Sequence, residues 1–309
     1  MDKPRNDLKD RLVYLCLRLL STLVHCWPVN FNLQAARLLG SIWYRLDAKH
    51  RARAIANLHR SFPHFTEQQC DTYAHRSQQH MFMLAVEVLF TTRLIRIDTW
   101  RDYVEIQNIQ QTLRLLMDRN RGLILLTAHY GNWEILGYVL ATLGFETTSV
   151  ARAFDNPYIN DCIFGVRESR GQKVLDKFGA TEQVTSILEN GGVVAFVADQ
   201  NAGKKGIFVD FFGRKASTYK SIGLLAMQYE VPIVIGFARR LNERFHFSVE
   251  IQDIIYPADW KDQPDSLRYI TQRYTTGIEN FIRADPGQYL WTHRRWKTRP
   301  KGEEPQQYD

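Results

Sequence analysis

The sequence predicts an α/β fold with a mixed, largely parallel sheet flanked by helices and an apolar helical membrane anchor at the N-terminus. Two observations predict it. From residue 103 onward, short β-rich runs alternate with helical patterns, which is typical of strands joined by helices. Before that point the apolar residues follow helical spacing. The strand candidates are 103–106, 122–128, 147–151, 193–198, 232–238 and 246–251.

The composition is that of a folded protein with a basic surface. The 309 residues suffice for one large domain or two small ones, and 45% hydrophobic with 24% charged residues exclude global disorder. A net charge of +7 favours anionic partners, such as nucleic acid, anionic lipid headgroups or phosphorylated metabolites. The four cysteines lack metal-ligand or disulfide spacing, which indicates a reducing compartment.

The apolar segment 12–29 is the first clue to location. It lacks a cleavage site of small residues, so we expect it to be retained. Arg11, Arg18 and His25 recur every seven residues and gather into one polar stripe on a helix. An arginine inside a spanning helix costs about 2.5 to 3.5 kcal/mol. We therefore favour an interfacial anchor over a spanning helix, and a core helix of a soluble domain is the third interpretation.

Three helices are expected between the anchor and the first strand. The segments 31–46 and 51–61 have helical patterns, and the second ends before a proline. Thr66 and Gln69 form a capping box for a long helix that reaches about Phe90. The expected organisation is an anchor (1–30), a single α/β domain with a helical N-terminal part (31–301) and a loose tail (302–309).

A histidine and a carboxylate stand five residues apart after the strand 122–128. On one continuous helix His129 and Glu134 would diverge by about 140°. They converge only if His129 lies in the turn and Glu134 in the first helical turn, with Gly131 loosening the backbone and Asn132 capping the helix. Such a pair suits general-base chemistry. The alternative is a histidine near a helix cap and a glutamate favoured by the helix dipole.

Two further strand ends carry polar residues. Arg152 follows the strand 147–151, and Asp199 and Gln200 follow the strand 193–198, with Lys204 in the glycine-rich stretch beyond. Reacting groups of open α/β sheets gather where strands end and helices begin. The alternatives are a solvated arginine at the sheet edge and an ordinary polar turn.

Aromatic residues gather in two places. Phe208, Phe211 and Phe212 line an acyl pocket or belong to the plain core. In the segment 291–299 indoles alternate with cations, a mixture that suits nucleic acid or a membrane interface. With an apolar segment at the other end of the chain, we favour the membrane.

The chain lacks several familiar catalytic motifs. We find no Gly-x-Ser-x-Gly elbow, no phosphate-binding Gly-x-x-x-x-Gly-Lys loop, no His-Glu-x-x-His helix and no Gly-x-Gly-x-x-Gly fingerprint. This narrows the choice of chemistry toward the His129 and Glu134 pair.

Together these blocks resemble the bacterial lipid A biosynthesis acyltransferases, the late lauroyl and myristoyl transferases of the lysophospholipid acyltransferase superfamily. The box from His129 to Glu134 is similar to that family's His-x-x-x-x-Asp/Glu box. The other similar blocks are 57–58 with 62–63, 152–157 with Arg167 and Gly171, 199–203 with 211–213 and Ala216, and 291–300. The resemblance therefore covers nearly the whole chain.

The resemblance implies an enzyme at the cytoplasmic face of the bacterial inner membrane. It would move a fatty acyl group from an acyl carrier protein or coenzyme A thioester to a hydroxyl of a lipid A-type glycolipid, without an acyl-enzyme, a metal or another cofactor. His129 would deprotonate the hydroxyl, and Glu134 would hold His129 and balance its charge. Arg152 and the helix start would stabilise the oxyanion, with Arg167 as a further candidate. The expected substrate-binding residues are Asn132, Arg152, Arg167, Asp199, Gln200 and Lys204.

Alternatives to this interpretation remain. A glutamate in the box and the absence of a Pro-Glu-Gly-Thr-Arg-like block count against lysophosphatidic acid as the acceptor, but another glycolipid or lysophospholipid remains open. A non-catalytic, basic, membrane-peripheral lipid-binding protein is the second class. Nucleic-acid binding is a third, and no recognisable module supports it.

Overall fold

The computed structural model describes residues 6–118, 120–176 and 179–304, and the sheet at its centre has seven strands. Their order is β1-β9-β8-β2-β5-β3-β4, and every neighbouring pair is parallel except β8 with β9. The strands are β1 (Val104–Gln107), β2 (Leu123–Thr127), β3 (Thr148–Ala151), β4 (Lys173–Asp176), β5 (Val193–Val197), β8 (Ile233–Arg240) and β9 (Phe247–Ile255). The predicted α/β class with a mixed, mostly parallel sheet is confirmed.

Helices cover both faces of the sheet because side chains alternate along each strand. Ile124 and Leu126 of β2 join a core cluster with α8, α9 and α11, whereas Leu123 and Leu125 face α5 and α6. These helices are α5 (Gln110–Met117), α6 (Trp133–Thr142), α8 (Ala180–Glu189), α9 (Ser221–Tyr229) and α11 (Ser266–Ala284). The shorter elements are α7 (Pro157–Glu168), α10 (Pro257–Trp260), η1 (Trp100–Asp102), η2 (Gly203–Lys205) and η3 (Pro286–Gln288).

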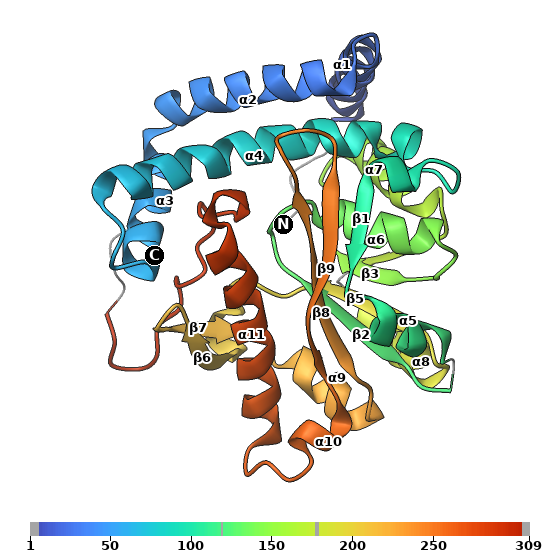
Figure 1. The fold of residues 1–309 in the computed structure, drawn as a ribbon, viewed down its shortest axis with the longest axis vertical. Helices are drawn as coiled ribbons and strands as arrows, with labels where there is room; N and C mark the ends of the chain where they lie inside the picture. Colours follow the sequence, from blue (N-terminus) through green and yellow to red (C-terminus); the bar gives the residue numbers. More distant parts are fainter. Residues whose placement is uncertain (1–5, 119, 177–178, 305–309) are drawn as a thin grey trace.

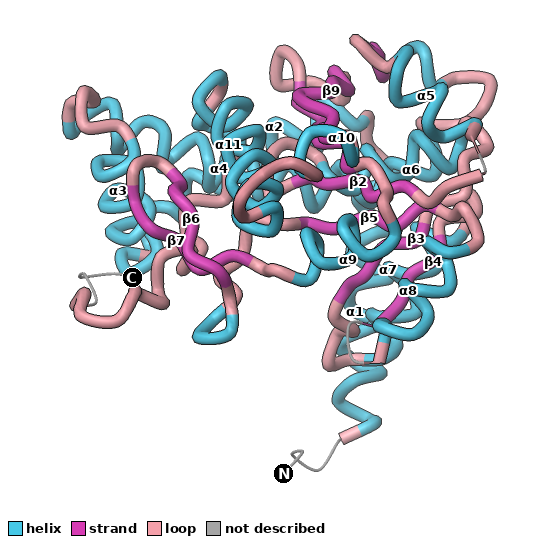
Figure 2. Tube along the Cα trace, turned by 90° about the horizontal axis from the view of Figure 1, so that it is seen from below, coloured by secondary structure: helices cyan, strands magenta, loops and turns pink. Residues whose placement is uncertain are grey.

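The N-terminal helices form a separate layer (Figure 1). They are α1 (Asp7–His25), α2 (Val29–Leu46), α3 (Ala48–Ser61) and α4 (Glu67–Leu94). The predicted capping box of Thr66 and Gln69 is present at the start of α4. The helix α2 lies along α4, and α1 projects from the body beside α7 (Figure 2). Within the described residues, no helix combines the length and apolarity that crossing a membrane requires.

A two-stranded hairpin, which the sequence analysis did not predict, stands apart from the main sheet (Figure 2). It comprises β6 (Ile207–Phe211) and β7 (Arg214–Thr218). The two residues between them, Phe212 and Gly213, both have positive φ, 54° and 69°. That backbone matches the twist of a tight hairpin. Phe212 tolerates the strained conformation because its ring is buried against Phe62 and Trp291.

The sequence analysis missed one strand of the sheet and assigned the segment 291–299 to the wrong environment. The strand β4 was missed because it is only four residues long and partly exposed, without a clear apolar alternation. The predicted membrane interface at 291–299 is wrong for its indoles, since Trp291 and Trp296 are buried in the main core. The tail 302–309 lies partly outside the described residues.

Candidate active site

The turn after β2 has the geometry that the spacing of His129 and Glu134 requires. Asn132 is the N-cap of α6, and its side-chain oxygen accepts the backbone N–H of Ile135 at 3.0 Å. Glu134 lies in the first turn of that helix. Gly131 has φ +55°, and an added Cβ would lie 2.0 Å from the carbonyl oxygen of Ala238. Glycine is therefore required both by the backbone conformation and by the lack of space.

His129 is held by Asp199. Its Nδ1 lies 2.7 Å from Oδ1 of Asp199, and its backbone N–H donates to Oδ2 at 3.1 Å. The two residues meet because β2 and β5 are parallel neighbours with Thr127 paired to Val197. Both residues therefore follow their strands at the same edge of the sheet.

The electrostatics of this pair favour a charged imidazolium. Burial disfavours the cation, but the adjacent carboxylate of Asp199, with a smaller contribution from Glu134, raises the pKa of His129 above its ordinary value. Burial of Asp199 acts to raise the pKa of that carboxyl group, yet its interactions with His129 hold the pKa well below the ordinary value. The carboxylate thus stays ionised and stabilises a proton on His129, which suits a general base.

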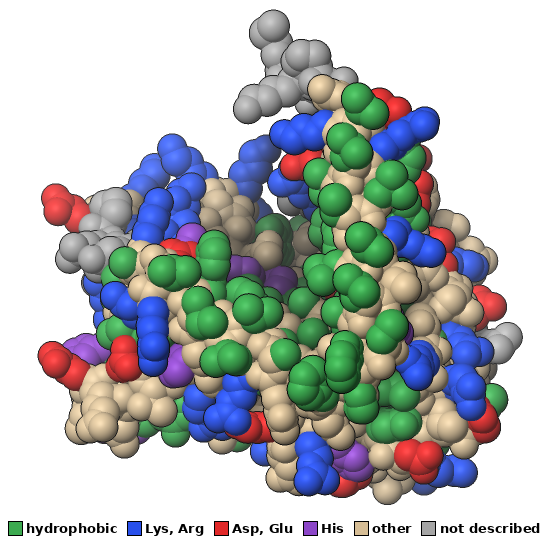
Figure 3. Space-filling view, turned by 90° about the horizontal axis from the view of Figure 1, so that it is seen from above, with side chains coloured by type: hydrophobic (Ala, Val, Ile, Leu, Met, Phe, Trp, Pro, Cys, Tyr) green, Lys and Arg blue, Asp and Glu red, His purple; other side chains and the backbone are tan. Residues whose placement is uncertain are grey.

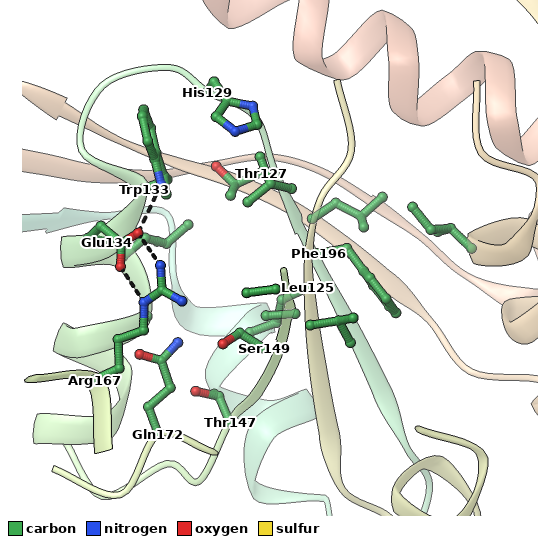
Figure 4. A pocket seen from close by; sticks show the side chains of 18 of the residues that line it. Leu125, Thr127, His129, Trp133, Glu134, Thr147, Ser149, Arg167, Gln172 and Phe196 are labelled. Carbon is green, nitrogen blue, oxygen red and sulfur yellow. Dashed lines mark hydrogen bonds and ion pairs between the residues drawn. The ribbon is translucent and has the colours of Figure 1, made fainter. Parts of the chain in front are cut away.

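Glu134 has a different partner from the one predicted. Its carboxylate accepts two hydrogen bonds from the Arg167 guanidinium, at 2.8 and 2.6 Å, and one from the indole Nε1 of Trp133 at 3.1 Å (Figure 4). The expected role of Glu134 as the group that holds His129 is therefore corrected: Asp199 has that position. The physical reason is that α6 carries Glu134 away from the turn and along the wall of a cavity.

A cavity of about 730 Å³ opens beside His129. Its wall combines the polar side chains of His129, Glu134 and Arg167 with apolar side chains from the sheet, among them Leu125 and Phe196 (Figure 4). The remaining apolar lining comes from Leu126, Leu136, Gly137, Leu140, Val150, Ala151, Ala195, Val197 and Ile222. Further polar lining comes from Thr127, Thr147, Ser149, Arg152, Gln172, Gln200, Tyr219 and Ser221. A cavity that joins an apolar region to polar groups suits a ligand with an apolar chain and a polar reactive end.

Besides His129 and Glu134, three of the predicted substrate-binding residues line this cavity. They are Arg152, Arg167 and Gln200. The amide nitrogen of Gln200 lies 3.5 Å from Nε2 of His129, so its side chain is close to the reacting proton. Arg152 is mostly exposed and pairs with Asp155 at 3.0 Å.

Other predicted residues lie elsewhere. Asn132 is fully buried as the α6 cap, and the exposed Lys204 of η2 is not part of the cavity wall. The predicted acyl pocket of Phe208, Phe211 and Phe212 is wrong. These residues belong to the β6–β7 hairpin, outside the cavity, where Phe211 stacks on Trp296 and Phe212 packs on Trp291. The plain core, which was the alternative interpretation, accounts for the last two.

A buried network that sequence reasoning missed supports the catalytic turn from below. Glu87 of α4 accepts a hydrogen bond from the Asn132 amide at 2.8 Å and forms a buried ion pair with Arg240 of β8. Nε2 of His80, also on α4, lies 3.0 Å from the Gly131 carbonyl oxygen. A charged residue within the apolar second half of a long helix was the sequence signal available for Glu87.

The C-terminal segment closes the other side of the turn. The backbone N–H of Leu290 donates to the His129 carbonyl at 3.0 Å, and that of Gly131 donates to the Gln288 carbonyl at 3.0 Å. The buried guanidinium of Arg295 donates to the Ser217 carbonyl at 2.6 Å. This segment therefore fixes the turn and the hairpin rather than presenting all its cations to solvent.

His293, from the same C-terminal segment, lies next to His129 and Asp199. Its ring centroid is 4.6 Å from that of His129, and burial lowers its pKa to about 4, so the imidazole is neutral at neutral pH. Ligand atoms of His129, Asp199 and His293 lie within 4.8 Å of one another, which is a possible metal-binding group. Because Asp199 already uses one oxygen for Nδ1 and the other for the backbone N–H of His129, we interpret the group as an oriented base.

A histidine bound to a carboxylate lines a cavity at the carboxyl edge of an α/β sheet, and this arrangement suits an enzyme that acts on a substrate with an apolar chain. Comparison with known proteins identifies the group. Residues 3–298 match the sequence model described as bacterial lipid A biosynthesis acyltransferase. The chain therefore belongs to this family of acyltransferases.

The chain is also similar to individual acyltransferases of three bacteria. A lipid A biosynthesis acyltransferase of Haemophilus influenzae is 26% identical over 271 residues, which cover 85% of this chain and 81% of the relative. The lipid A biosynthesis lauroyltransferase of Escherichia coli is 25% identical over 283 residues, 89% of this chain and 88% of the relative. A phosphatidylinositol mannoside acyltransferase of Mycobacterium tuberculosis is 31% identical over 96 residues, 30% of each chain.

Proposed function

We propose that this acyltransferase moves a fatty acyl group from the thioester of an acyl carrier protein or coenzyme A to a hydroxyl of a lipid A-type glycolipid. The observation that carries the proposal is that His129, bound to the buried Asp199, lines a cavity with a partly apolar wall. The family match supports the acceptor class.

In the proposed reaction the acceptor hydroxyl attacks the thioester carbonyl directly. Nε2 of His129 takes the hydroxyl proton as the new carbon–oxygen bond forms, and Asp199 stabilises the imidazolium. The carbon–sulfur bond then breaks, and the proton on His129 passes to the leaving thiolate. The atoms balance as one ester and one thiol, without an acyl-enzyme, a metal or another cofactor.

The developing oxyanion requires hydrogen-bond donors, and several residues of the cavity lining could supply them. Arg152 and the backbone at the start of α6 stay the proposed donors, and the Gln200 amide near His129 is a further one. The side chain of Arg167 is already bound to Glu134, so we assign that ion pair to shaping the cavity wall. The acyl chain would lie along the apolar residues of β2, β5 and α6.

We place this reaction at the cytoplasmic face of the bacterial inner membrane. A lipid acceptor resides in a bilayer, and α1 leaves its apolar side chains exposed, which supports an interfacial anchor. The four cysteines are free, as in a reducing compartment.

The test is incubation of the purified protein with a radiolabelled acyl carrier protein thioester and a lipid A precursor. We expect an acylated product with wild-type protein and none above background with folded His129→Ala. Full transfer by that variant would overturn the mechanism. Protein that binds the acceptor without turnover would support the non-catalytic lipid-binding class instead.

A second acceptor class has one specific observation in its favour. The partial match to a relative named for phosphatidylinositol mannoside shows that similar segments occur in enzymes named for other glycolipids. Parallel assays with that glycolipid, and mass spectrometry of lipids from cells with and without this protein, separate the two acceptors. The mass added to the lipid also gives the acyl length.

A further inference from the structure

A helix on a water-exposed surface turns its apolar face to the protein and its polar face to water. The helix α1 instead exposes its apolar side chains. Two members of its polar stripe contact the protein, although Arg11 stays largely exposed: Arg11 donates to the Tyr158 hydroxyl at 2.8 Å, and His25 stacks on Phe90 with ring centroids 4.6 Å apart. Its apolar side chains point away, with Leu15 59% and Leu19 63% exposed. An outward apolar face requires an apolar environment in order to be stable.

The helix α2 shows the same arrangement, although the sequence analysis treated it as an ordinary helix. Its buried face, which consists of Asn32, Leu33, Ala36, Gly40 and Tyr44, is largely small or polar, and an added Cβ at Gly40 would lie 2.7 Å from the Gln79 Cα of α4. Its opposite face exposes Leu39, Trp43 and Leu46 at 55%, 48% and 72%. These three residues recur at helical spacing and therefore form one continuous stripe.

The two apolar faces belong to one surface of the molecule. Viewed from above, apolar side chains run along both helices, beside a hollow in the surface (Figure 3). The helix α1 packs on α7, which also carries Arg167 of the cavity wall, so the two apolar faces lie next to the active-site cavity. We call the outer faces of α1 and α2, with Trp27 in the turn between them, the apolar platform; its other members are Leu8, Leu12, Val13, Leu15, Leu17, Leu19, Leu20, Leu23, Phe31, Leu38, Leu39, Ile42, Trp43 and Leu46. Their number exceeds the scattered apolar residues of an ordinary surface.

We infer that the whole apolar platform, α2 included, docks on an anionic bilayer surface, with the active-site hollow opening toward that bilayer. The composition matches an interface: Trp43 is an interfacial aromatic residue, and the exposed cations Arg45 and Lys49 stand at the same end of α2. The occupant is a lipid surface, because the platform runs along two helices and combines many exposed apolar side chains with interfacial tryptophans and flanking cations.

Only one part of this inference rests on the proposed function: the expectation that a lipid acceptor enters the active site from the bilayer. The platform itself is argued from burial and the orientation of side chains. It extends the expected anchor from one helix to two and fixes which side of the molecule meets the membrane. An acceptor could then enter the hollow without leaving the lipid surface.

The test compares two double variants of the full chain in flotation with vesicles of phosphatidylethanolamine and phosphatidylglycerol. Leu39→Glu with Trp43→Glu alters the platform on α2. Met117→Glu with Leu224→Glu is the matched control, because those residues are 72% and 48% exposed but lie on α5 and α9. Circular dichroism checks that both variants are folded.

We expect the α2 variant to partition at least about tenfold more weakly than wild type, and the control to partition like wild type. Equal partitioning of both variants would overturn the role of α2, and wild-type protein that does not float would overturn the platform altogether. The alternative occupant is a second copy of this chain, and sedimentation of the lipid-free protein tests it. A wild-type dimer that the α2 substitutions dissociate would assign the platform to that second copy.

Turnover of a detergent-dispersed acceptor keeps this result separate from the proposed function. The α2 variant should retain its rate within about twofold there, because the substitutions lie far from the His129 and Asp199 pair and only remove docking. If wild type shows no turnover in detergent, the proposed function fails, while the vesicle comparison still decides the docking surface.

Discussion

Replacing Asp199 with asparagine tests the orientation of His129 directly. The substitution keeps the shape of the side chain but leaves one oxygen for two hydrogen bonds, from the backbone N–H at 3.1 Å and from Nδ1 at 2.7 Å. If the oxygen keeps the backbone N–H, the amide NH₂ faces Nδ1 and forces the proton onto Nε2. The nitrogen that faces the substrate then no longer accepts a proton.

The size of the effect follows from the lost charge. Charges about 4 Å apart at an effective dielectric of 20 interact by about 4 kcal/mol. Loss of that stabilisation from an imidazolium in the transition state lowers kcat by about 10³-fold, since each 1.36 kcal/mol is a factor of ten. KM should change by less than about threefold, because the cavity wall that binds the chain is unaltered.

The pH dependence has a defined sign. A base must be neutral, so the wild-type rate should rise with pH through the raised pKa of His129. In Asp199→Asn the carboxylate that raises the pKa is gone while burial remains, so the acid limb should move to lower pH. The residual rate of the variant should therefore reach its plateau at a lower pH than that of wild type.

The assay is single-turnover transfer of a radiolabelled acyl group across a pH series, with folding checked by circular dichroism. Asp210→Asn is the matched control, because Asp210 is a half-exposed carboxylate on β6 paired with Lys215 and should leave kcat unchanged. The reasoning is refuted if folded Asp199→Asn retains kcat within about threefold of wild type, or if its acid limb stays in place.

Three other substitutions have defined expectations. Gly131→Ala should lower the free energy of unfolding by about 3 kcal/mol, because the added Cβ brings both backbone strain and a clash with a carbonyl oxygen. Gly144→Ala is the control: that position also has positive φ but open space, so the loss should be only about 1 kcal/mol. Equal losses of the two variants in urea titrations would contradict the clash. Glu87→Gln leaves Arg240 buried without its charge partner and should lower the free energy of unfolding by about 3 to 5 kcal/mol. Adding Arg240→Met should restore part of that loss. If the denaturant midpoint does not recover in the double variant, the ion pair is not the cause. Glu134→Gln should lower kcat far less than Asp199→Asn and raise KM, because it loosens the cavity wall but leaves the base oriented; a loss of kcat as large as that of Asp199→Asn would return Glu134 to the role of orienting group.

The sequence was sufficient where local patterns decide the structure. Six strands, the long capped helix α4 and the turn from His129 to Glu134 follow from periodicity, capping chemistry and one glycine. Arg152 and Gln200, two of the polar residues predicted at strand ends, line the cavity, and their role in substrate binding stays a prediction. These features depend on a few consecutive residues, so a single sequence contains them.

Contacts between distant segments were not predictable in the same way. Asp199 was recognised at a strand end, but its pairing with His129 depends on β2 and β5 being neighbours, which periodicity does not specify. The aromatic residues Phe211 and Trp296 fit a pocket or a membrane interface as well as a core, and only the packing of the hairpin against the C-terminal segment decides. The hairpin itself carries Phe-Gly in place of the usual Asn-Gly signal.

The placement of β2 between β5 and β8 has a consequence for how the enzyme acquires its activity. Both neighbours lie far along the chain: Asp199 is 70 residues beyond His129, and β8 begins only at Ile233. Such pairings close long loops and form late in folding. On the ribosome His129 and Asp199 cannot meet until β5 has emerged, so a nascent chain that already carries the complete apolar platform still lacks the proposed general base and its partner. The order of the sequence therefore completes the proposed docking surface before the proposed catalytic pair.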